Sequence, residues 1–416
     1  MKILIVGAGA REDAIGSSLW RNEVGSLHFA PGTKGTLGYG SNTPVELDKP
    51  EEVLRIAEYL EVDFTVVGPE VPLAAGIVDL FHSKGKAIFG PTRAAAQLEA
   101  SKSFALQVMD RAHVPHPDSL VFTNPGAVLT FFRKYGNRVA VKTDGLAAGK
   151  GTFICETEHE VLAAAKRCAE LSPGKPIIVQ EFLEGREVSV FCFTDGWNIS
   201  SLVAACDYKR VGEGDTGPMT GGMGSYCWPE FWTEDLENWV RNHILLPVIR
   251  QMHFGETPFQ GVLYAGLMVC KEFLEGESVP ILAKVLEFNC RLGDPEAQVI
   301  LPLLKTDLLE IMQACTKEQL NLVEVRWRKD MAAVGVVIAS DGYPQKSVKG
   351  NIEGLEKLES NILVFHGGES GRMITLVMLA PTLEHATEKV YENLQRLQLT
   401  EAFYRRDIGI QAVSAI

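Results

Sequence analysis

The first third of the chain alternates short apolar segments with segments of helical periodicity, and this alternation limits the possible folds more than any other feature. The patterns between the apolar segments predict helices at residues 11–21, 50–60 and 73–84. The apolar segments predict strands at residues 2–6, 27–30, 64–67 and 87–89. Strands that alternate with helices form a parallel sheet with helices on its faces. We therefore expect an N-terminal α/β domain with a doubly wound parallel sheet over residues 1–100.

The pattern changes after residues 91–101, where we expect a domain boundary. About 150 residues per domain would give three domains in a chain of 416 residues. We expect a central region over residues 101–325 and a small C-terminal α+β domain over residues 326–416. The predicted helices lie at 101–109, 303–315 and 382–397, and residues 212–224 are predicted to be a loop. The predicted strands lie at 139–142, 177–182, 188–193, 262–269, 284–289, 332–338, 362–365 and 374–379.

The composition excludes several classes of protein. A net charge of −13 argues against a nucleic-acid binder, which normally presents a basic face. No apolar run approaches the ~18 residues of a membrane helix, and the apolar start is too short for a signal peptide. We expect a cytoplasmic protein that does not bind membranes. Its eight cysteines have no CxxC spacing and are expected to be free thiols.

The first motif follows the opening strand and has the sequence Gly7-Ala8-Gly9-Ala10-Arg11-Glu12. Its glycines allow a sharp turn and the approach of an anion to the start of a helix. Glu12 replaces the third glycine of a dinucleotide fingerprint. The motif therefore favours a phosphate-bearing substrate over a nicotinamide cofactor, and a turn without a ligand is the alternative.

A second motif, residues 142–151, begins with Lys142 at the end of a predicted strand and continues into small residues that include Lys150. Small residues let a loop close over a polyphosphate, and lysines neutralise its charge. The spacing is not that of a P-loop. The alternative is a flexible hairpin tip.

The third motif, residues 287–296, places Glu287, Asn289 and Arg291 two residues apart on a predicted strand, so they share one face. A carboxylate and an amide oxygen suit Mg²⁺, and arginine binds a phosphoryl group or carboxylate in bidentate fashion. The alternative is a solvated sheet face with an ion pair.

Two further segments are candidates for ligand binding. Residues 207–224 are too glycine-rich to pack a core and suggest a backbone cradle for a polar ligand, or else a mobile surface loop. Residues 180–185 suggest a strand that runs into a turn, which could offer main-chain groups to a base. Glu184 or Glu187 could then bind a ribose.

Taken in order, these segments resemble the glycinamide ribonucleotide synthetase (phosphoribosylamine–glycine ligase) family of the ATP-grasp superfamily. The resemblance covers almost the whole chain, and its most specific part is Gly214-Asp215-Thr216-Gly217-Pro218 with Gly221-Gly222-Met223-Gly224. It implies a central ATP-grasp domain pair, with a flap at about residues 122–190. It also implies an enzyme that joins glycine to 5-phosphoribosylamine through glycyl phosphate. ATP is the implied co-substrate, Mg²⁺ the implied metal with Mn²⁺ as its alternative, and a monomer or homodimer the implied state.

The resemblance also implies roles for single residues. Lys102 and Lys142 correspond to lysines that hold ATP phosphates, and Glu287 and Asn289 to the metal ligands. Arg291, Lys142 and Asp215 are the implied catalytic residues. The implied flap residues are Gly145, Gly149, Lys150 and Gly151, and those for adenine and ribose are Glu181, Leu183 and Glu187. The implied substrate-side residues are Gly9, Arg11, Glu12, Pro69, Glu70, Asp215, Thr216 and Arg291.

The chain departs from the family pattern on the substrate side. Members usually have His where Asp13 and Tyr208 stand, and Asn where Met219 stands, and they have a longer hairpin at residues 366–372. Three alternatives therefore remain. One is an ATP-grasp ligase for a different acid and amine, one is a non-catalytic nucleotide-binding protein, and one is a nicotinamide-dependent dehydrogenase that leaves the later motifs unexplained.

Overall fold

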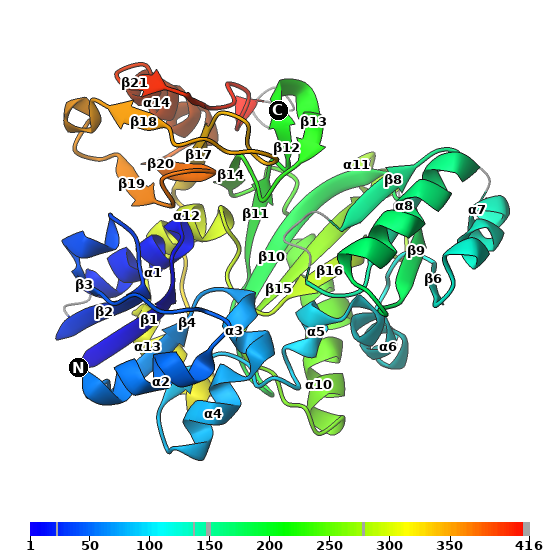
Figure 1. Ribbon diagram of the computed structural model, residues 1–416, viewed down its shortest axis with the longest axis horizontal. Helices are drawn as coiled ribbons and strands as arrows, with labels where there is room; N and C mark the ends of the chain where they lie inside the picture. The colour runs from blue at the N-terminus through cyan, green and yellow to red at the C-terminus, as the bar shows by residue number, and fades with distance from the viewer. Residues whose placement is uncertain (22–23, 136–137, 147–150, 277–278, 411–416) are drawn as a thin grey trace.

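The computed structural model describes residues 1–21, 24–135, 138–146, 151–276 and 279–410. The N-terminal α/β region lies at the lower left of Figure 1, with the last part of the chain above it. A long central sheet separates these from a smaller unit at the right. Within the described residues, no helix is both long and apolar enough to cross a bilayer.

The N-terminal region is a five-stranded sheet in which neighbouring strands pair in parallel, as the sequence predicts. Its buried strands pair from Lys2 opposite Ser26 and from Ile3 opposite Phe64. In order across the sheet, the strands are β3 (Gly40–Asn42), β2 (Ser26–Pro31), β1 (Lys2–Gly7), β4 (Phe64–Val67) and β5 (Ile88–Phe89). The helices of this region are α1 (Ala10–Trp20), α2 (Pro50–Tyr59), α3 (Glu70–Ala75) and α4 (Ile77–Ser83).

The helix predicted at residues 73–84 is wrong in detail, because two helices occupy this region. Gly76 separates α3 from α4 and has φ +90°, a left-handed conformation that glycine adopts without steric cost. The first of the two helices also begins earlier than predicted, at Glu70. This start places Glu70 directly after Pro69, at the carboxyl end of β4.

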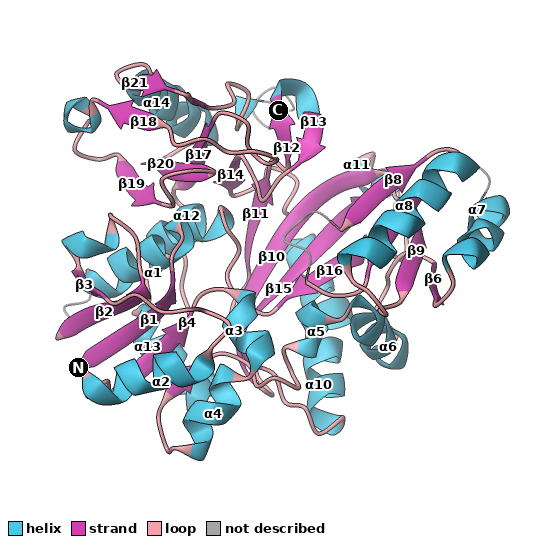
Figure 2. Ribbon diagram, in the orientation of Figure 1, coloured by secondary structure: helices cyan, strands magenta, loops and turns pink. Residues whose placement is uncertain are grey.

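The central sheet is long, continuous and antiparallel in its observed pairs, and Figure 2 shows it crossing the middle of the molecule. It crosses the boundary that the sequence predicts near residue 325, because Cys227 of β14 pairs with Ala333 of β17. Its strands run in the order β16 (Ala283–Asn289), β15 (Gln260–Cys270), β10 (Gly185–Asp195), β11 (Val203–Asp207), β14 (Gly224–Cys227), β17 (Ala332–Ser340), β20 (Arg372–Ala380) and β19 (Leu363–His366), and β22 (Ala402–Phe403) pairs with β17.

The unit at the right of Figure 1 is a second, smaller antiparallel sheet with its own apolar core. Residues such as Val141, Val161 and Val179 are fully buried between this sheet and its helices. The strands run in the order β6 (Ser119–Phe122), β9 (Ile177–Glu181), β7 (Val139–Thr143) and β8 (Thr152–Cys155), and the helices are α7 (Leu129–Tyr135) and α8 (Glu158–Leu171).

The segment 212–224 is not the structureless loop that its glycines predict. It contains part of a two-stranded hairpin of β12 (Arg210–Gly212) and β13 (Thr216–Met219), in which Arg210 pairs with Met219. The segment then enters the central sheet, because β14 begins at Gly224. Cross-strand pairing therefore supplies the order that the local composition does not predict.

The helix predicted at residues 303–315 starts later, at Leu308, because the Asp307 side chain accepts a hydrogen bond from the amide of Leu309 and caps the helix there. The remaining central helices are α5 (Gln97–Ala100), α6 (Lys102–Ala112), α9 (Glu234–Val240), α10 (Leu246–Phe254), α11 (Lys271–Leu274), α12 (Glu296–Ile300) and α13 (Leu308–Thr316). The last region adds β18 (Asn351–Glu353), α14 (Leu383–Leu394) and β21 (Gln398–Thr400).

Candidate active site

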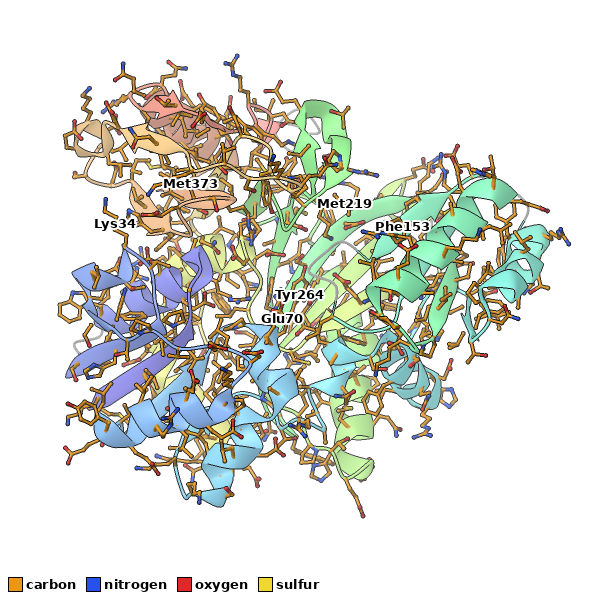
Figure 3. The ribbon with its side chains drawn as sticks, viewed as in Figure 1. Lys34, Glu70, Phe153, Met219, Tyr264 and Met373 are labelled. Atoms are coloured by element: carbon orange, nitrogen blue, oxygen red, sulfur yellow. The ribbon has the colours of Figure 1, made fainter. Side chains whose placement is uncertain are left out.

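A cavity of about 340 Å³ lies where the N-terminal region, the two antiparallel sheets and the last region of the chain meet. Two of its lining residues, Glu70 and Tyr264, are labelled close to the centre of the molecule in Figure 3. Its apolar wall includes Leu98, Leu106, Met109, Ile178, Leu286 and Phe288. Its charged lining consists of Arg11, Lys102, Lys142, Lys209, Arg291 and Arg372, with Glu70, Glu99, Asp207, Glu287, Asp294 and Glu296.

The two predicted phosphate-binding lysines both line this cavity. Lys142, the penultimate residue of β7, donates to the carbonyl oxygen of Leu286 at 3.2 Å, and Lys102 donates to the carbonyl oxygen of Gly145 at 3.2 Å. The buried carboxylate of Asp144 accepts hydrogen bonds from the amide and hydroxyl of Ser103. Asp144 therefore ties the end of β7 to the start of α6, and this tie sets the two lysines on one cavity.

The charges in the cavity shift the pKa of Lys142 and of Glu287. Burial lowers the pKa of Lys142 to about 8, and the nearby Glu287 carboxylate opposes that effect. Burial by itself raises the pKa of Glu287, but the cations Lys209 and Lys102 outweigh it and hold this pKa below its ordinary value. The cavity therefore holds an ionised carboxylate beside a group of cations.

The predicted face of Glu287, Asn289 and Arg291 is present, since all three side chains line the cavity at the end of β16. Arg291 donates to the Asn289 side-chain oxygen at 3.3 Å. The described residues contain no cluster of three or more His, Cys, Asp or Glu residues that could hold a metal without help. A carboxylate and an amide oxygen do fit Mg²⁺ that shares its ligands with substrate phosphates.

Arg291 is held between two carboxylates. Its guanidinium lies 2.8 Å from Glu70 of α3 and 2.9 Å from Glu99 of α5. Burial raises the pKa of Glu70, but Arg291 and Arg11 outweigh it and lower the pKa to about 2. Burial dominates at Glu99, so the pKa of that carboxyl lies above its ordinary value although Arg291 opposes this. The arginine thereby joins the N-terminal region to the end of the central strand β16.

The turn after β1 is braced by its own glutamate. The buried Glu12 carboxylate accepts from the amide of Gly9 and from the guanidinium of Arg11, both at 2.6 Å. Arg11 also donates to the carbonyl oxygen of Leu292 at 3.2 Å and lines the cavity with Pro69 and Glu70. Of the predicted substrate-side residues, Arg11, Pro69 and Glu70 therefore face the cavity, and Glu12 supports the turn beneath them.

The other predicted residues fall into three groups. Gly145 and Gly151 line the cavity, whereas Gly149 and Lys150 fall outside the described residues. Gly9, Glu181, Leu183, Glu187, Asp215 and Thr216 are not among the residues that line the cavity.

These residues have other contacts in the structure. Glu181 pairs with Lys284, and Glu187 pairs with Lys209 at 2.5 Å. Asp215 accepts from Arg405 at 3.0 Å on the hairpin of β12 and β13. Glu187, one of the residues predicted to bind adenine and ribose, therefore contacts the cavity lining through Lys209, while the Asp215 side chain is paired outside the lining.

Asp207 and Lys209 also line the cavity, although the sequence predicted only a backbone cradle for their segment, residues 207–224, and gave these two side chains no role. The Lys209 ammonium group lies 3.5 Å from Asp207, and burial raises the pKa of Asp207 to about 7. Their spacing of two residues, like that of Glu287 and Asn289, is the pattern that could have identified them. Glu99, Glu296 and Arg372 are brought to the cavity by contacts distant in sequence.

The three single residues that depart from the family pattern all lie in ordered elements or make internal contacts. Asp13 is fully buried on α1 and accepts from the amide of His366 at 2.6 Å. The hydroxyl of Tyr208 accepts from the amide of Gly409 at 3.0 Å, and its ring lies under the Arg405 guanidinium. Met219 ends strand β13. The first two connect the last region of the chain to the rest of the molecule.

Comparison with known proteins agrees with this architecture. The chain matches the phosphoribosylglycinamide synthetase N domain over residues 1–99, its ATP-grasp (A) domain over 100–297 and its C domain over 333–411. A phosphoribosylamine–glycine ligase of Ralstonia nicotianae is 39% identical over 99% of this chain and 100% of its own length.

Solved structures are similar as well. The crystal structure of a Thermotoga maritima phosphoribosylamine–glycine ligase matches with a TM-score of 0.82 and 28% identity, over 98% of this chain and all of that one. The biotin carboxylase domain of a Hydrogenobacter thermophilus 2-oxoglutarate carboxylase shares the fold, with a TM-score of 0.73 and 14% identity over 97% of this chain and 91% of that one.

A large and a small antiparallel sheet on either side of a lysine-lined cavity define an ATP-grasp protein, which is the class predicted from the sequence. Within that class, the chain belongs to the phosphoribosylglycinamide synthetase (phosphoribosylamine–glycine ligase) family.

Proposed function

We propose that this protein is a carbon–nitrogen ligase of purine biosynthesis that joins glycine to 5-phosphoribosylamine. The products are glycinamide ribonucleotide, ADP and phosphate. The observation that best supports this proposal is that Lys102 and Lys142 line the same cavity as the Glu287, Asn289 and Arg291 face. The full-length similarity to proteins named phosphoribosylamine–glycine ligase supports the choice of substrates.

The chemistry requires activation of a carboxylate. Glycine attacks the γ-phosphorus of ATP through a carboxylate oxygen, which gives glycyl phosphate and ADP. The amine of 5-phosphoribosylamine then attacks the acyl carbon, the bond to the phosphate oxygen breaks, and an amine proton is released. No covalent enzyme intermediate is needed, so catalysis consists of positioning and of charge neutralisation.

The residues of the cavity divide this work by position. Lys102 and Lys142 neutralise the phosphates of ATP, and the apolar wall that contains Leu106 and Phe288 holds the base. Arg291 contacts the acyl phosphate as it forms. Arg11 and Glu70 face the 5-phosphoribosylamine side. A cavity between two sheets also keeps water away from the mixed anhydride.

A divalent metal is part of this proposal, with Mg²⁺ preferred over Mn²⁺. Glu287 and Asn289 would hold it, since the pKa of Glu287 is lowered and both side chains line the cavity. Bound there, it would neutralise charge on the transferred phosphoryl group. The related biotin carboxylase domain was solved as a complex with MgADP. We also propose a cytoplasmic location and a monomeric or homodimeric state.

The test is ADP release by the purified protein with ATP, Mg²⁺, glycine and 5-phosphoribosylamine, and with each omitted in turn. Release that depends on all of them, with glycinamide ribonucleotide as product, supports the proposal. Product formation without glycine would instead identify a ligase for another acid, the alternative that the changes at Asp13 and Tyr208 motivate. ATP binding without turnover would identify a non-catalytic homologue.

The matched variant is Glu287→Gln, which keeps the size of the side chain and removes its charge. We expect loss of glycine-dependent ADP release with little change in folding. Normal activity in this variant would contradict the metal assignment. The control is Glu272→Gln on α11, since Glu272 is an exposed acidic residue that does not line the cavity. We expect this control to have wild-type activity.

A further inference from the structure

Among the described residues of the last region of the chain, the cavity lining includes Arg372. This residue begins β20, directly after the short segment 366–371. One guanidinium nitrogen donates to the carbonyl oxygens of Gly221 and Asp294, at 2.8 and 2.6 Å. Another nitrogen lies 2.9 Å from the Asp294 carboxylate. One side chain thus holds two segments of the central region.

The Asp294 carboxylate is fixed from both of its oxygens. Oδ2 faces Arg372, and Oδ1 accepts from the side-chain amide of Gln298 at 2.7 Å. Gln298 is itself fully buried on α12. A carboxylate with both oxygens held in this way is pre-organised, so little conformational entropy is lost when a further donor binds.

This carboxylate remains charged in the cavity. Burial by itself raises the pKa of Asp294, but Arg372 and Arg11 outweigh burial and lower it. Asp294 also lies close to the turn that follows β1, because a Cβ atom built on Gly9 would come 3.4 Å from the Asp294 Oδ2 atom. It therefore meets the N-terminal, central and C-terminal parts of the molecule at one point.

The loop between β13 and β14, called the Gly221 loop below, is also held by the last region of the chain. The amide of Gly221 donates to the hydroxyl of Tyr343 at 3.1 Å, while its carbonyl oxygen accepts from Arg372. A Cβ atom on Gly221 would lie 3.2 Å from the Arg372 guanidinium. A Cβ atom here would displace the guanidinium by a few tenths of an ångström, so the close contact couples the position of the loop to that of the arginine.

We propose that Asp294 binds the amino group of an ammonium-bearing substrate in the cavity, and that Arg372 is a positioning residue that sets Asp294 and the Gly221 loop. The proposal rests on the proposed ligase function, in which glycine and 5-phosphoribosylamine both present an amino group. Each oxygen of Asp294 has a second lone pair, and a carboxylate is the natural acceptor for an ammonium donor.

The test compares Asp294→Asn and Arg372→Lys with the wild type. The KM values for glycine, 5-phosphoribosylamine and ATP are measured separately, together with kcat and the urea midpoint of unfolding. We expect Asp294→Asn to raise the KM of one amino-bearing substrate about tenfold or more, because a charged hydrogen bond is lost. The KM for ATP should stay within about twofold by the same reasoning. The substrate that responds identifies which amino group Asp294 binds.

Arg372→Lys should shift the same KM in the same direction by a smaller factor, since lysine keeps the charge but cannot hold three oxygens in a fixed fork. The control is Glu369→Gln in the same segment, an exposed carboxylate paired with Lys349 at 2.7 Å. We expect it to leave all three KM values unchanged, which separates contact with Asp294 from long-range charge effects.

Two results would overturn the inference. One is a set of three KM values that change together or not at all in Asp294→Asn. The other is a lower urea midpoint in both variants without any difference between substrates, which would indicate a purely structural role. A wild-type protein that makes no glycinamide ribonucleotide would instead contradict the proposed function, so the two failures are distinguishable.

Discussion

Replacing Arg291 with methionine should destabilise the protein mainly through the carboxylates that it leaves behind. Arg291 lies within 2.9 Å of both Glu70 and Glu99, and both of these side chains are mostly buried. Methionine fills a similar length of space without a charge. The variant therefore removes the shared cation and leaves two carboxyl groups close together in a poorly solvated position.

The expected cost is about 3 kcal/mol at neutral pH. The pKa of Glu70 falls from an ordinary value of 4.5 to about 2, with Arg291 as the main stabilising charge and Arg11 as the second. A difference of about 2.5 pKa units corresponds to about 3 kcal/mol at ~1.36 kcal/mol per unit. Breaking a buried ion pair from one side typically costs ~3–5 kcal/mol, which agrees.

The loss of stability caused by Arg291→Met should shrink as the pH falls. A carboxyl with a lowered pKa adds stability above its unfolded pKa, and this stability disappears between 4.5 and about 2 in the wild type. The pKa of Glu99 is raised by burial, so protonation at low pH favours its folded form, and more so without Arg291. Both effects reduce the difference in the free energy of unfolding between wild type and Arg291→Met, by about 1 kcal/mol from pH 7.5 to pH 4.

The difference in the free energy of unfolding is measured by urea unfolding, followed by tryptophan fluorescence, at pH 7.5 and pH 4. Adding Glu99→Gln to the variant should recover at least about 1 kcal/mol, because one buried charge is then absent. The control is Arg326→Met. Arg326 lies 4.0 Å from the exposed Glu324 carboxylate, and losing this surface pair should cost less than about 1 kcal/mol. A loss of stability below about 1 kcal/mol in Arg291→Met, or one that does not depend on pH, would show that the unpaired carboxylates do not destabilise the variant.

Three further outcomes are expected. The affinity for ATP should fall as the pH rises above about 8, because Lys142 loses its proton there. This fall should be absent in Lys142→Met. If the affinity of that variant depends on pH as the wild type does, another group causes the effect. Gly7→Ala should cost about 2 kcal/mol in urea unfolding, since Gly7 has φ +134° and a Cβ atom would lie 2.6 Å from Glu12; a neutral substitution would show that the turn can shift. Removing divalent metal with a chelator should abolish ADP release and Mg²⁺ should restore it; full activity in the chelator would exclude the metal from catalysis.

The strands were predictable where apolar residues are continuous. The N-terminal parallel sheet and the long strands β10, β15 and β16 lie close to their predicted positions, because buried strands consist of runs of apolar residues. The hairpin of β12 and β13 was not predictable in the same way. Its glycines and Pro218 disfavour strands locally, and cross-strand pairs such as Arg210 with Met219, together with contacts to Arg405, order it.

The candidate site was predictable where its residues are close in sequence. Glu287 and Asn289 alternate on β16 and Arg291 follows two residues later, just beyond the strand, so period-two spacing predicts that they lie together. Other charged residues of the cavity were not predictable, because Glu99 of α5 reaches Arg291, and Arg372 of β20 reaches Asp294, only through the tertiary fold. No local pattern distinguishes these two from ordinary surface charges.

The resemblance to a family placed Asp215 at the site, and the structure pairs it with Arg405 outside the cavity lining. A role that depends on contact between a loop and bound substrates is a property of the complex. The pairing seen here gives the position of Asp215 in the protein alone. Its proposed catalytic role therefore stays a prediction.

A crystal structure with a non-hydrolysable ATP analogue, Mg²⁺ and glycine would show whether this cavity binds the nucleotide. We expect phosphate oxygens to contact the ammonium groups of Lys102 and Lys142, and the metal to contact Glu287 and Asn289. A nucleotide bound at any other surface, with these four side chains touching no part of it or of the metal, would exclude the proposed ATP site.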